Sequence, residues 1–511
     1  MIDPYSTDVL WVVIVGFIIA FILAFGIGAN SVPNSFATSV GSKVLTLRQA
    51  CCLGTVCEIA GSVLLGYKVS GTVRKGVLQL TVYEGAELEL MLGMFAVLIS
   101  SSVLLLIAIF LKLPVSATHG IVGATLGFSL VCRGNDGINW GVLGLIVGSW
   151  FLSPVLSGVI SVSLFALVRH FILNAPNPIV RGLLSLPIIY GVTVFINVFS
   201  IFLDGPTLLY FDRIPWWATL IISLCCGAVT MLTVQLVLVP FMKRKLGGQS
   251  ETGSTQKTRD DEYKVDSSCT EVNGTLTGII DNMVPPAVKM VPFAVNSEGP
   301  QTTNSNEETE PPGAVAKHGQ DNLAFSLSSD NGTGQPTSED KAAPPELFSF
   351  LQILAATFSS FARGGNDVSN AIGPVIALWL IYTEGSVQQK EETPIYILFY
   401  GGIGMSVGLW VYGQRVMKTI GEDLTKIAAS TGFTIEIGAA LTVLLASKIG
   451  MPISTTHCLV GSVVFVGWAN ATKEGVDWKL FRNIVVAWLV TVPVSGLLSA
   501  AVIAILREVA L

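Results

Sequence analysis

The hydrophobic pattern of this chain consists of long apolar segments separated by short polar connections. A helix that crosses the hydrocarbon core of a bilayer needs about 20 apolar residues, and most of these segments reach or approach that length. Twelve segments stand out: 9–29, 48–66, 91–113, 120–132, 141–168, 182–203, 214–240, 347–362, 398–413, 434–449, 457–470 and 481–506. The pattern therefore predicts an all-α membrane protein with about twelve transmembrane segments.

Two of these segments, 120–132 and 457–470, are too short to cross a bilayer unaided. They occupy matching places in the two halves of the chain. Short apolar segments in corresponding positions are typical of transporters in which discontinuous helices form the binding site. We therefore expect broken or re-entrant helices at both places.

Composition supports the membrane assignment: 51% of the residues are hydrophobic and 13% are charged. A soluble protein carries about 25% charged residues, so a soluble globular enzyme is excluded. The segment 243–346 differs from the rest, because it is rich in small polar and acidic residues. Such a composition buries too little apolar surface to fold and predicts a disordered cytoplasmic loop. Without a basic surplus, nucleic acid is not an expected partner.

Two motifs recur across this loop. The heptapeptide Gly-Ala-Asn-Ser-Val-Pro-Asn at 28–34 matches Gly-Gly-Asn-Asp-Val-Ser-Asn at 364–370, 336 positions later. The hexapeptide Pro-Val-Ser-Ala-Thr-His at 114–119 matches Pro-Ile-Ser-Thr-Thr-His at 452–457, 338 positions later. Matches at a nearly constant offset indicate an internal repeat.

A further match pairs Trp150 with Trp488, again 338 positions apart. The repeat divides the chain into a first membrane repeat (1–170), linking transmembrane helices (171–242), the loop (243–346) and a second membrane repeat (347–511). Seven crossings precede the loop, so the two repeats begin on opposite sides of the membrane and are inverted.

Basic residues indicate the orientation of the chain. Lys243, Arg244 and Lys245 follow the seventh segment, whereas the N-terminal stretch is acidic. Short loops rich in Lys and Arg lie on the cytoplasmic side. We therefore expect the large loop in the cytoplasm and both termini outside the cell.

The Gly-Ala-Asn and Gly-Gly-Asn motifs each follow an apolar helix. Irregular backbone at membrane depth is tolerated only where it is buried in protein or lines a watery cavity. Unwound carbonyls with nearby amides and carboxylates then supply oxygen ligands for Na⁺. Surface turns that cap ordinary helices are the alternative, which the presence of two symmetric copies disfavours. The motif side chains concerned are Asn30, Ser31, Asn34, Asn366, Asp367 and Asn370.

The Pro-x-Ser-x-Thr-His motif opens an apolar segment in each half. Proline followed by Ser or Thr is a helix start, and a helix N-terminus favours anions. Inversion of the repeats aims two such N-termini at one central point, and simple N-capping is the alternative. The hydroxyls expected to face an oxyanion belong to Ser116, Thr118, Ser454, Thr455 and Thr456. His119 and His457 have no metal-ligand spacing, and we expect them to be packing residues.

Glu58 and Glu436 lie inside apolar segments. A charge at the bilayer centre costs at least about 3 kcal/mol, so such residues mark an ion path or pair with a cation. This reading is favoured for Glu58. A position at the membrane interface is as good an explanation for Glu436, which lies near the start of its segment.

These motifs resemble those of the inorganic phosphate transporter family, and most nearly the animal type III sodium-dependent phosphate transporters. The resemblance covers 1–245 and 345–511, and its most distinctive stretches are 364–374, 452–458 and 480–488. It implies two inverted repeats, often in a dimer, that move monovalent phosphate inward with sodium. It also implies that both motif pairs line one shared site and that Glu58 and Glu436 are acids needed for transport.

The chain departs from the family pattern at several positions. Ser31 stands where the family has Asp, and Pro33 where it has Ala. Arg363 replaces a usual His, and Lys43 a common Gly. The region has lost one negative charge and gained positive ones, which predicts weaker or altered sodium coupling.

The sequence thus predicts a multi-pass plasma-membrane symporter that imports inorganic phosphate with sodium by alternating access. We assign phosphate binding to Ser116, Thr118, Ser454, Thr455, Thr456, Ser31, Asn34 and Asn370. We assign sodium binding to Asn30, Asn366, Asp367, Glu58 and Glu436. Sodium is a co-substrate, neither a cofactor nor a transition metal is expected, and a homodimer in the lipid bilayer is the expected assembly.

Two alternatives remain open. One is a transporter that is driven by protons or carries another oxyanion. The other is a phosphate sensor with weak transport that signals through the cytoplasmic loop. An enzyme is the weakest option, because no nucleophile–base pair and no metal cluster stands out.

Overall fold

The computed structural model describes residues 3–41, 44–111, 115–244, 345–414, 429–470 and 478–510. In these ranges the chain is almost entirely helical, with a single antiparallel bridge between Leu78 and Ile138. Most of the loop expected at 243–346 lies outside the described residues, as does Lys43. The predicted all-α class is confirmed.

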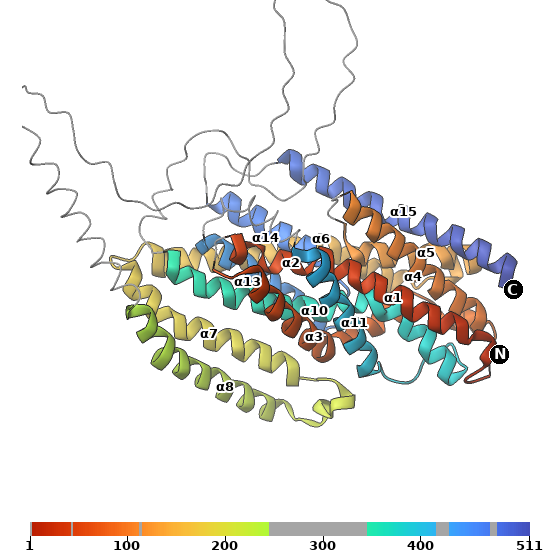
Figure 1. The fold of residues 1–511 in the computed structure, drawn as a ribbon, viewed down its shortest axis with the longest axis horizontal. Coiled ribbons are helices and arrows are strands. Elements are labelled where there is room, and N and C mark those ends of the chain that lie inside the picture. Colours follow the sequence, from red (N-terminus) through yellow and green to blue (C-terminus); the bar gives the residue numbers. More distant parts are fainter. Residues whose placement is uncertain are drawn as a thin grey trace, which may run out of the picture. The chain divides into compact units, whose positions relative to one another are not determined.

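The helices follow the apolar segments closely (Figure 1). The first half contains α1 (Leu10–Asn30), α2 (Val32–Gly41), α3 (Leu47–Gly71), α4 (Glu87–Phe110), α5 (Ala117–Arg133) and α6 (Trp140–Val168). Then come α7 (Pro178–Phe202) and α8 (Trp216–Thr233). The second half contains α10 (Pro345–Glu384), α11 (Ile395–Gly408), α13 (Ala429–Lys448), α14 (Thr455–Ala469) and α15 (Trp478–Ala510). Each of the twelve predicted segments overlaps one of these helices.

Among the described residues, nine helices are long and apolar enough to cross a membrane. The two short segments form helices α5 and α14, each of which follows a Pro-x-Ser motif. Helix α5 has 17 residues and α14 has 15, which at 1.5 Å per residue is less than a bilayer core. Both begin inside the protein, so the predicted broken helices are found here.

The packing of the helices repeats itself when the two halves are exchanged. Helix α5 packs on α15 as α14 packs on α6, and α10 packs on α3 and α13 as α1 packs on α11 and α4. The match extends to single atoms. A Cβ on Gly123 would lie 2.4 Å from the carbonyl oxygen of Val492, and one on Gly461 would lie 2.1 Å from that of Pro154. Both pairs are related by the same offset of 338 positions.

The first helices of the two repeats run in opposite directions. Near the start of α1, the N–H of Tyr5 donates to the carbonyl of Tyr382, near the end of α10, over 2.9 Å. Their rings are also in contact, with centroids 5.5 Å apart. The two repeats are therefore inverted relative to each other.

The Gly-Gly-Asn motif is not unwound, contrary to expectation. Helix α10 continues unbroken through 364–370. Its two glycines allow close packing against a neighbouring helix. A Cβ on Gly364 would lie 2.7 Å from the carbonyl oxygen of Glu58, and one on Gly365 would lie 2.5 Å from the Cβ of Leu65. Helix α3 thus lies directly against α10.

The first copy of the motif is interrupted only at Ser31, between α1 and α2. Pro33 explains this difference between the repeats, because proline has no N–H to donate to the carbonyl four residues earlier. Ser369 occupies the equivalent place in α10 and the helix continues. Even Ser31 keeps a helical bond, since its N–H donates to the Ile27 carbonyl over 2.8 Å.

The glycine contacts between the repeats lead to a stability prediction. Gly461→Ala places a methyl group against backbone, and overpacking of this kind costs about 1–3 kcal/mol. Gly144→Ala is the matched control, because a Cβ there meets nothing within 4 Å and alanine favours the helix. Thermal unfolding of the purified protein in detergent should show a lower midpoint for Gly461→Ala and no loss for the control. Equal midpoints would contradict the packing described here.

Candidate functional site

The N-termini of α5 and α14 meet in the interior of the protein. Ser116 caps α5, because its Oγ accepts from the His119 N–H at 3.4 Å. Ser454 caps α14 in the same way, with the His457 N–H at 3.3 Å. The Thr118 hydroxyl donates to the Ile453 carbonyl over 2.9 Å and so joins the two helix starts. The predicted convergence of two helix N-termini is thus present in the fold.

Four aromatic rings surround this junction and obey the same symmetry. The His119 ring lies 3.9 Å from that of Trp150, and the His457 ring lies 3.5 Å from that of Trp488. The two imidazoles are 4.6 Å apart, on the axis that relates the repeats. The Nδ1 of His457 is also 3.1 Å from the Trp150 carbonyl oxygen. Both histidines therefore act as packing residues.

Helix α10 carries the polar side chains that reach these helix starts. The Thr455 hydroxyl, at the first turn of α14, donates to the Asp367 carboxylate at 3.2 and 3.4 Å. The Nδ2 of Asn370 donates to the Thr118 hydroxyl over 3.1 Å, at the first turn of α5. One face of α10 thus contacts both helix N-termini, one with an acid and one with an amide.

Asn366 lies on α10 between these contacts and the connection that leads into α14. Its Nδ2 lies 3.5 Å from the Ser447 hydroxyl and 3.4 Å from the Met451 carbonyl. Its Oδ1 has no hydrogen-bond partner among the described residues, and the same holds for Oδ1 of Asn370. Two amide oxygens of α10 are therefore buried and free to accept.

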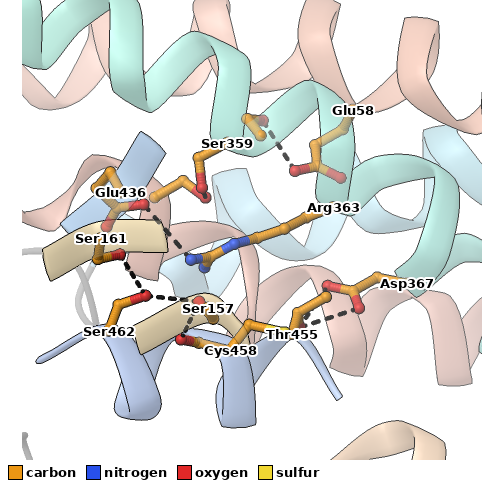
Figure 2. A network of polar contacts seen from close by, with 12 residues as sticks. Glu58, Ser157, Ser161, Ser359, Arg363, Asp367, Glu436, Thr455, Cys458 and Ser462 are labelled. Atoms are coloured by element: carbon orange, nitrogen blue, oxygen red, sulfur yellow. Dashed lines mark hydrogen bonds and ion pairs between the residues drawn. The ribbon is translucent and has the colours of Figure 1, made fainter. Parts of the chain in front are cut away.

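A cluster of buried charges surrounds Arg363 (Figure 2). Its Nη2 is 3.4 Å from Oε2 of Glu436 on α13, and the two side chains are 2% and 4% exposed. Glu58 projects from α3 and accepts from the Ser360 hydroxyl over 2.8 Å. Three carboxylates, those of Glu58, Asp367 and Glu436, thus share the interior with one guanidinium. Glu436 is buried inside the protein.

The first copy of the motif is placed differently. Ser31 is buried, while Asn30 and Asn34 are half-buried. Among the described residues, none of these side chains donates to or accepts from the charged cluster. The positions that correspond to Arg363, Asp367 and Glu436 in the first repeat are Ile27, Ser31 and Leu98. Arg363, Asp367 and Glu436 of the second repeat therefore have no charged counterparts in the first repeat, which contributes Glu58 to the cluster.

Further polar residues near the cluster were missed by the sequence reasoning. Ser157 and Ser161 of α6 bond to Ser462 of α14 at 2.6 and 2.8 Å, and Ser157 also donates to the Cys458 carbonyl over 2.7 Å. Their spacing of four residues was the available signal, because it places both hydroxyls on one helix face. Thr456, which was assigned to phosphate, is half-buried in the first turn of α14.

This geometry combines two kinds of binding group. Helix N-termini with hydroxyls favour an anion, whereas buried carboxylate and amide oxygens favour a hard cation. The Oε2 of Glu58 has no partner among the described residues, and leaving a buried acceptor unsatisfied is costly. Among those residues no group of three or more His, Cys, Asp or Glu is placed to hold a metal ion. The helix N-termini and the buried oxygens therefore suit an oxyanion accompanied by a hard cation.

Comparison with known proteins agrees with this arrangement. The phosphate transporter family matches residues 27–499. Sodium-dependent phosphate transporter 1-A of Danio rerio is 41% identical, over 99% of this chain and 96% of the relative. Sodium-dependent phosphate transporter 1 of Homo sapiens is 39% identical, over 99% and 97%. Sodium-dependent phosphate transporter 2 of Cricetulus griseus is 40% identical, over 97% and 98%.

A solved structure, described as the sodium-dependent phosphate transporter, has the same fold. Its TM-score is 0.73 at 31% identity, and the alignment covers 98% of this chain and 99% of the other. The family match includes both repeats, and the relatives align along nearly the entire chain. This chain therefore belongs to the phosphate transporter family.

Proposed function

We propose that this protein imports inorganic phosphate across the plasma membrane and couples the uptake to sodium ions. The observation that carries the proposal is the meeting of two helix N-termini beside a buried cluster of carboxylates. The names of its relatives support the same substrate and the same coupling ion. The charges of phosphate and sodium then offset each other within a site that is closed to water.

Phosphate is held at the two helix starts. The backbone N–H groups there donate to its oxygens, together with hydroxyls from Ser116, Ser454 and Thr456. These donors carry no charge, which suits the monoanion. The hydroxyls of Thr118 and Thr455 hold the two helix starts in place through the Ile453 carbonyl and the Asp367 carboxylate. The remaining O–H of the monoanion needs an acceptor, and the free Oδ1 of Asn370 supplies one beside Thr118.

Sodium is held beside the phosphate, among acceptors on α10 and α3. The free oxygens of Glu58 and Asn366 and the carboxylate of Asp367 form its ligand set. Because Thr455 bonds to Asp367 over 3.2 Å, an ion at Asp367 also fixes the first turn of α14. Sodium binding thereby shapes the phosphate site, which is the basis of coupling.

The transport cycle follows from the inverted repeats. Alternating access rocks one repeat against the other around the fixed central site. We assign 1–170 and 347–511 to the moving repeats, 171–242 to the linking helices and 243–346 to a cytoplasmic loop. Both termini then lie outside the cell, and two copies form a dimer.

The first prediction concerns Thr455. Thr455→Val keeps the shape of the side chain and removes the donor to Asp367. A hydrogen bond to a charged group is worth about 1.5–3 kcal/mol, so phosphate uptake should fall about tenfold or more. The assay is radiolabelled phosphate uptake in sodium medium, with sulfate as competitor.

Thr230→Val is the matched control for this experiment. Its hydroxyl donates only to the Cys226 carbonyl of its own helix, over 2.9 Å, so uptake should be unchanged. Full uptake by Thr455→Val would contradict the proposed site. If uptake persisted in choline medium and increased as the pH was lowered, the coupling ion would be the proton and not sodium.

The second prediction concerns Ser31, where the family resemblance implies Asp. We propose that the missing carboxylate weakens sodium coupling on the side of the first repeat. Ser31→Asp restores the charge, and opposite charges in a buried site attract strongly. Half-maximal uptake should then require several-fold less sodium than in the wild type. An identical sodium titration for both proteins would refute the role of Ser31.

A further inference from the structure

We propose that Arg363 is a built-in cation that takes the place of one sodium ion in the coupling site. This inference rests on the proposed function and makes it more specific. It follows from where the guanidinium lies, from how loosely it is bonded and from the charges around it.

The position of Arg363 is the first observation. Its side chain is 2% exposed, although arginine is almost never fully buried unless it is paired. Figure 2 shows it extending from α10 through the space between Glu58 and Asp367 and ending beside Glu436. The guanidinium therefore lies inside the acidic cluster, nearest to Glu436.

The bonding of Arg363 is the second observation. A structural Arg–carboxylate pair is commonly bidentate, with N–O distances of about 2.7–2.9 Å. Arg363 instead makes a single, longer contact, from Nη2 to Oε2 of Glu436 at 3.4 Å. Its Nε has no partner among the described residues. The geometry is that of a charge placed in an oxygen-lined space, and not that of an optimised salt bridge.

The charge count is the third observation. Three buried carboxylates face one guanidinium, which stays protonated in proteins. The equivalent places in the first repeat are uncharged, because Ile27, Ser31 and Leu98 stand there. Bound sodium has to neutralise only the carboxylates that Arg363 leaves uncompensated. The resident cation thus lowers the number of sodium ions that the site attracts.

Transport has a different charge balance as a result. Arg363 is part of the chain and remains in the protein when phosphate leaves, whereas sodium is released with it. Each phosphate is therefore accompanied by one sodium ion fewer than in the same site without the arginine. The net charge that crosses the membrane per phosphate is lower by one.

Arg363→Gln removes the charge, and Arg363→Lys keeps it. In proteoliposomes, radiolabelled sodium and phosphate fluxes give the ratio of the two ions, and the current gives the charge per phosphate. Arg363→Gln should carry one more sodium ion and one more positive charge per phosphate than the wild type. Arg363→Lys should keep the wild-type ratio, and so should Arg74→Gln, a control at a guanidinium that is 3% exposed and bonds to the Glu391 carbonyl.

An Arg363→Gln protein that transports more slowly at an unchanged ratio would overturn the proposal, because a purely structural arginine predicts that result. If the variant does not transport, thermal unfolding in detergent with sodium or choline decides. The midpoint of Arg363→Gln should rise more with sodium than that of the wild type or of Arg363→Lys, and equal rises would overturn the proposal. Failure of the wild type to take up phosphate would instead refute the proposed function, and the unfolding comparison would still test Arg363.

Discussion

The cost of holding charge inside a membrane protein governs the centre of this structure. Glu58, Asp367 and Glu436 are all removed from water, and an uncompensated charge in such surroundings is strongly destabilising. The groups that stabilise these carboxylates are one guanidinium, the hydroxyls of Ser360 and Thr455 and the dipoles of two helices. Three carboxylates thus share one guanidinium, which is why we propose a cation site here, beside the helix starts proposed to bind phosphate.

Close helix contacts make this arrangement possible. Glycines in α10 let α3 approach until backbone touches backbone, which brings Glu58 beside Gly364. Glycines in α5 and α14 do the same against α15 and α6, and so hold two short helices whose first turns lie in the interior. The polar centre is thus positioned by glycines that have no polar side chain. Substitutions at these glycines should therefore disturb the geometry of the polar centre.

Much of this was accessible from the amino-acid sequence. The lengths of the apolar segments predicted the helices, and nearly constant offsets between motifs predicted two repeats whose helix starts meet. The continuity of α10 was not predicted, because a glycine pair is compatible with both an unwound turn and a close helix contact. The contact with α3 that favours the helix is not visible in the sequence. The charge cluster was also missed, because Arg363, Asp367 and Glu436 have uncharged counterparts in the first repeat and Glu58 comes from a separate helix, α3. Arg363 was visible only as an unusual residue, since its partners lie on two other helices.

Two hydrogen bonds at the symmetry axis break the equivalence of the repeats. Thr118 donates to the Ile453 carbonyl, but its counterpart Thr456 makes no such bond to Val115 among the described residues. His457 contacts the Trp150 carbonyl, whereas Nδ1 of His119 is without a partner there. In the alternating-access cycle proposed above, the two repeats would exchange conformations. These bonds would then pass to Thr456 and His119, and the junction would mark which of the two end states the protein is in.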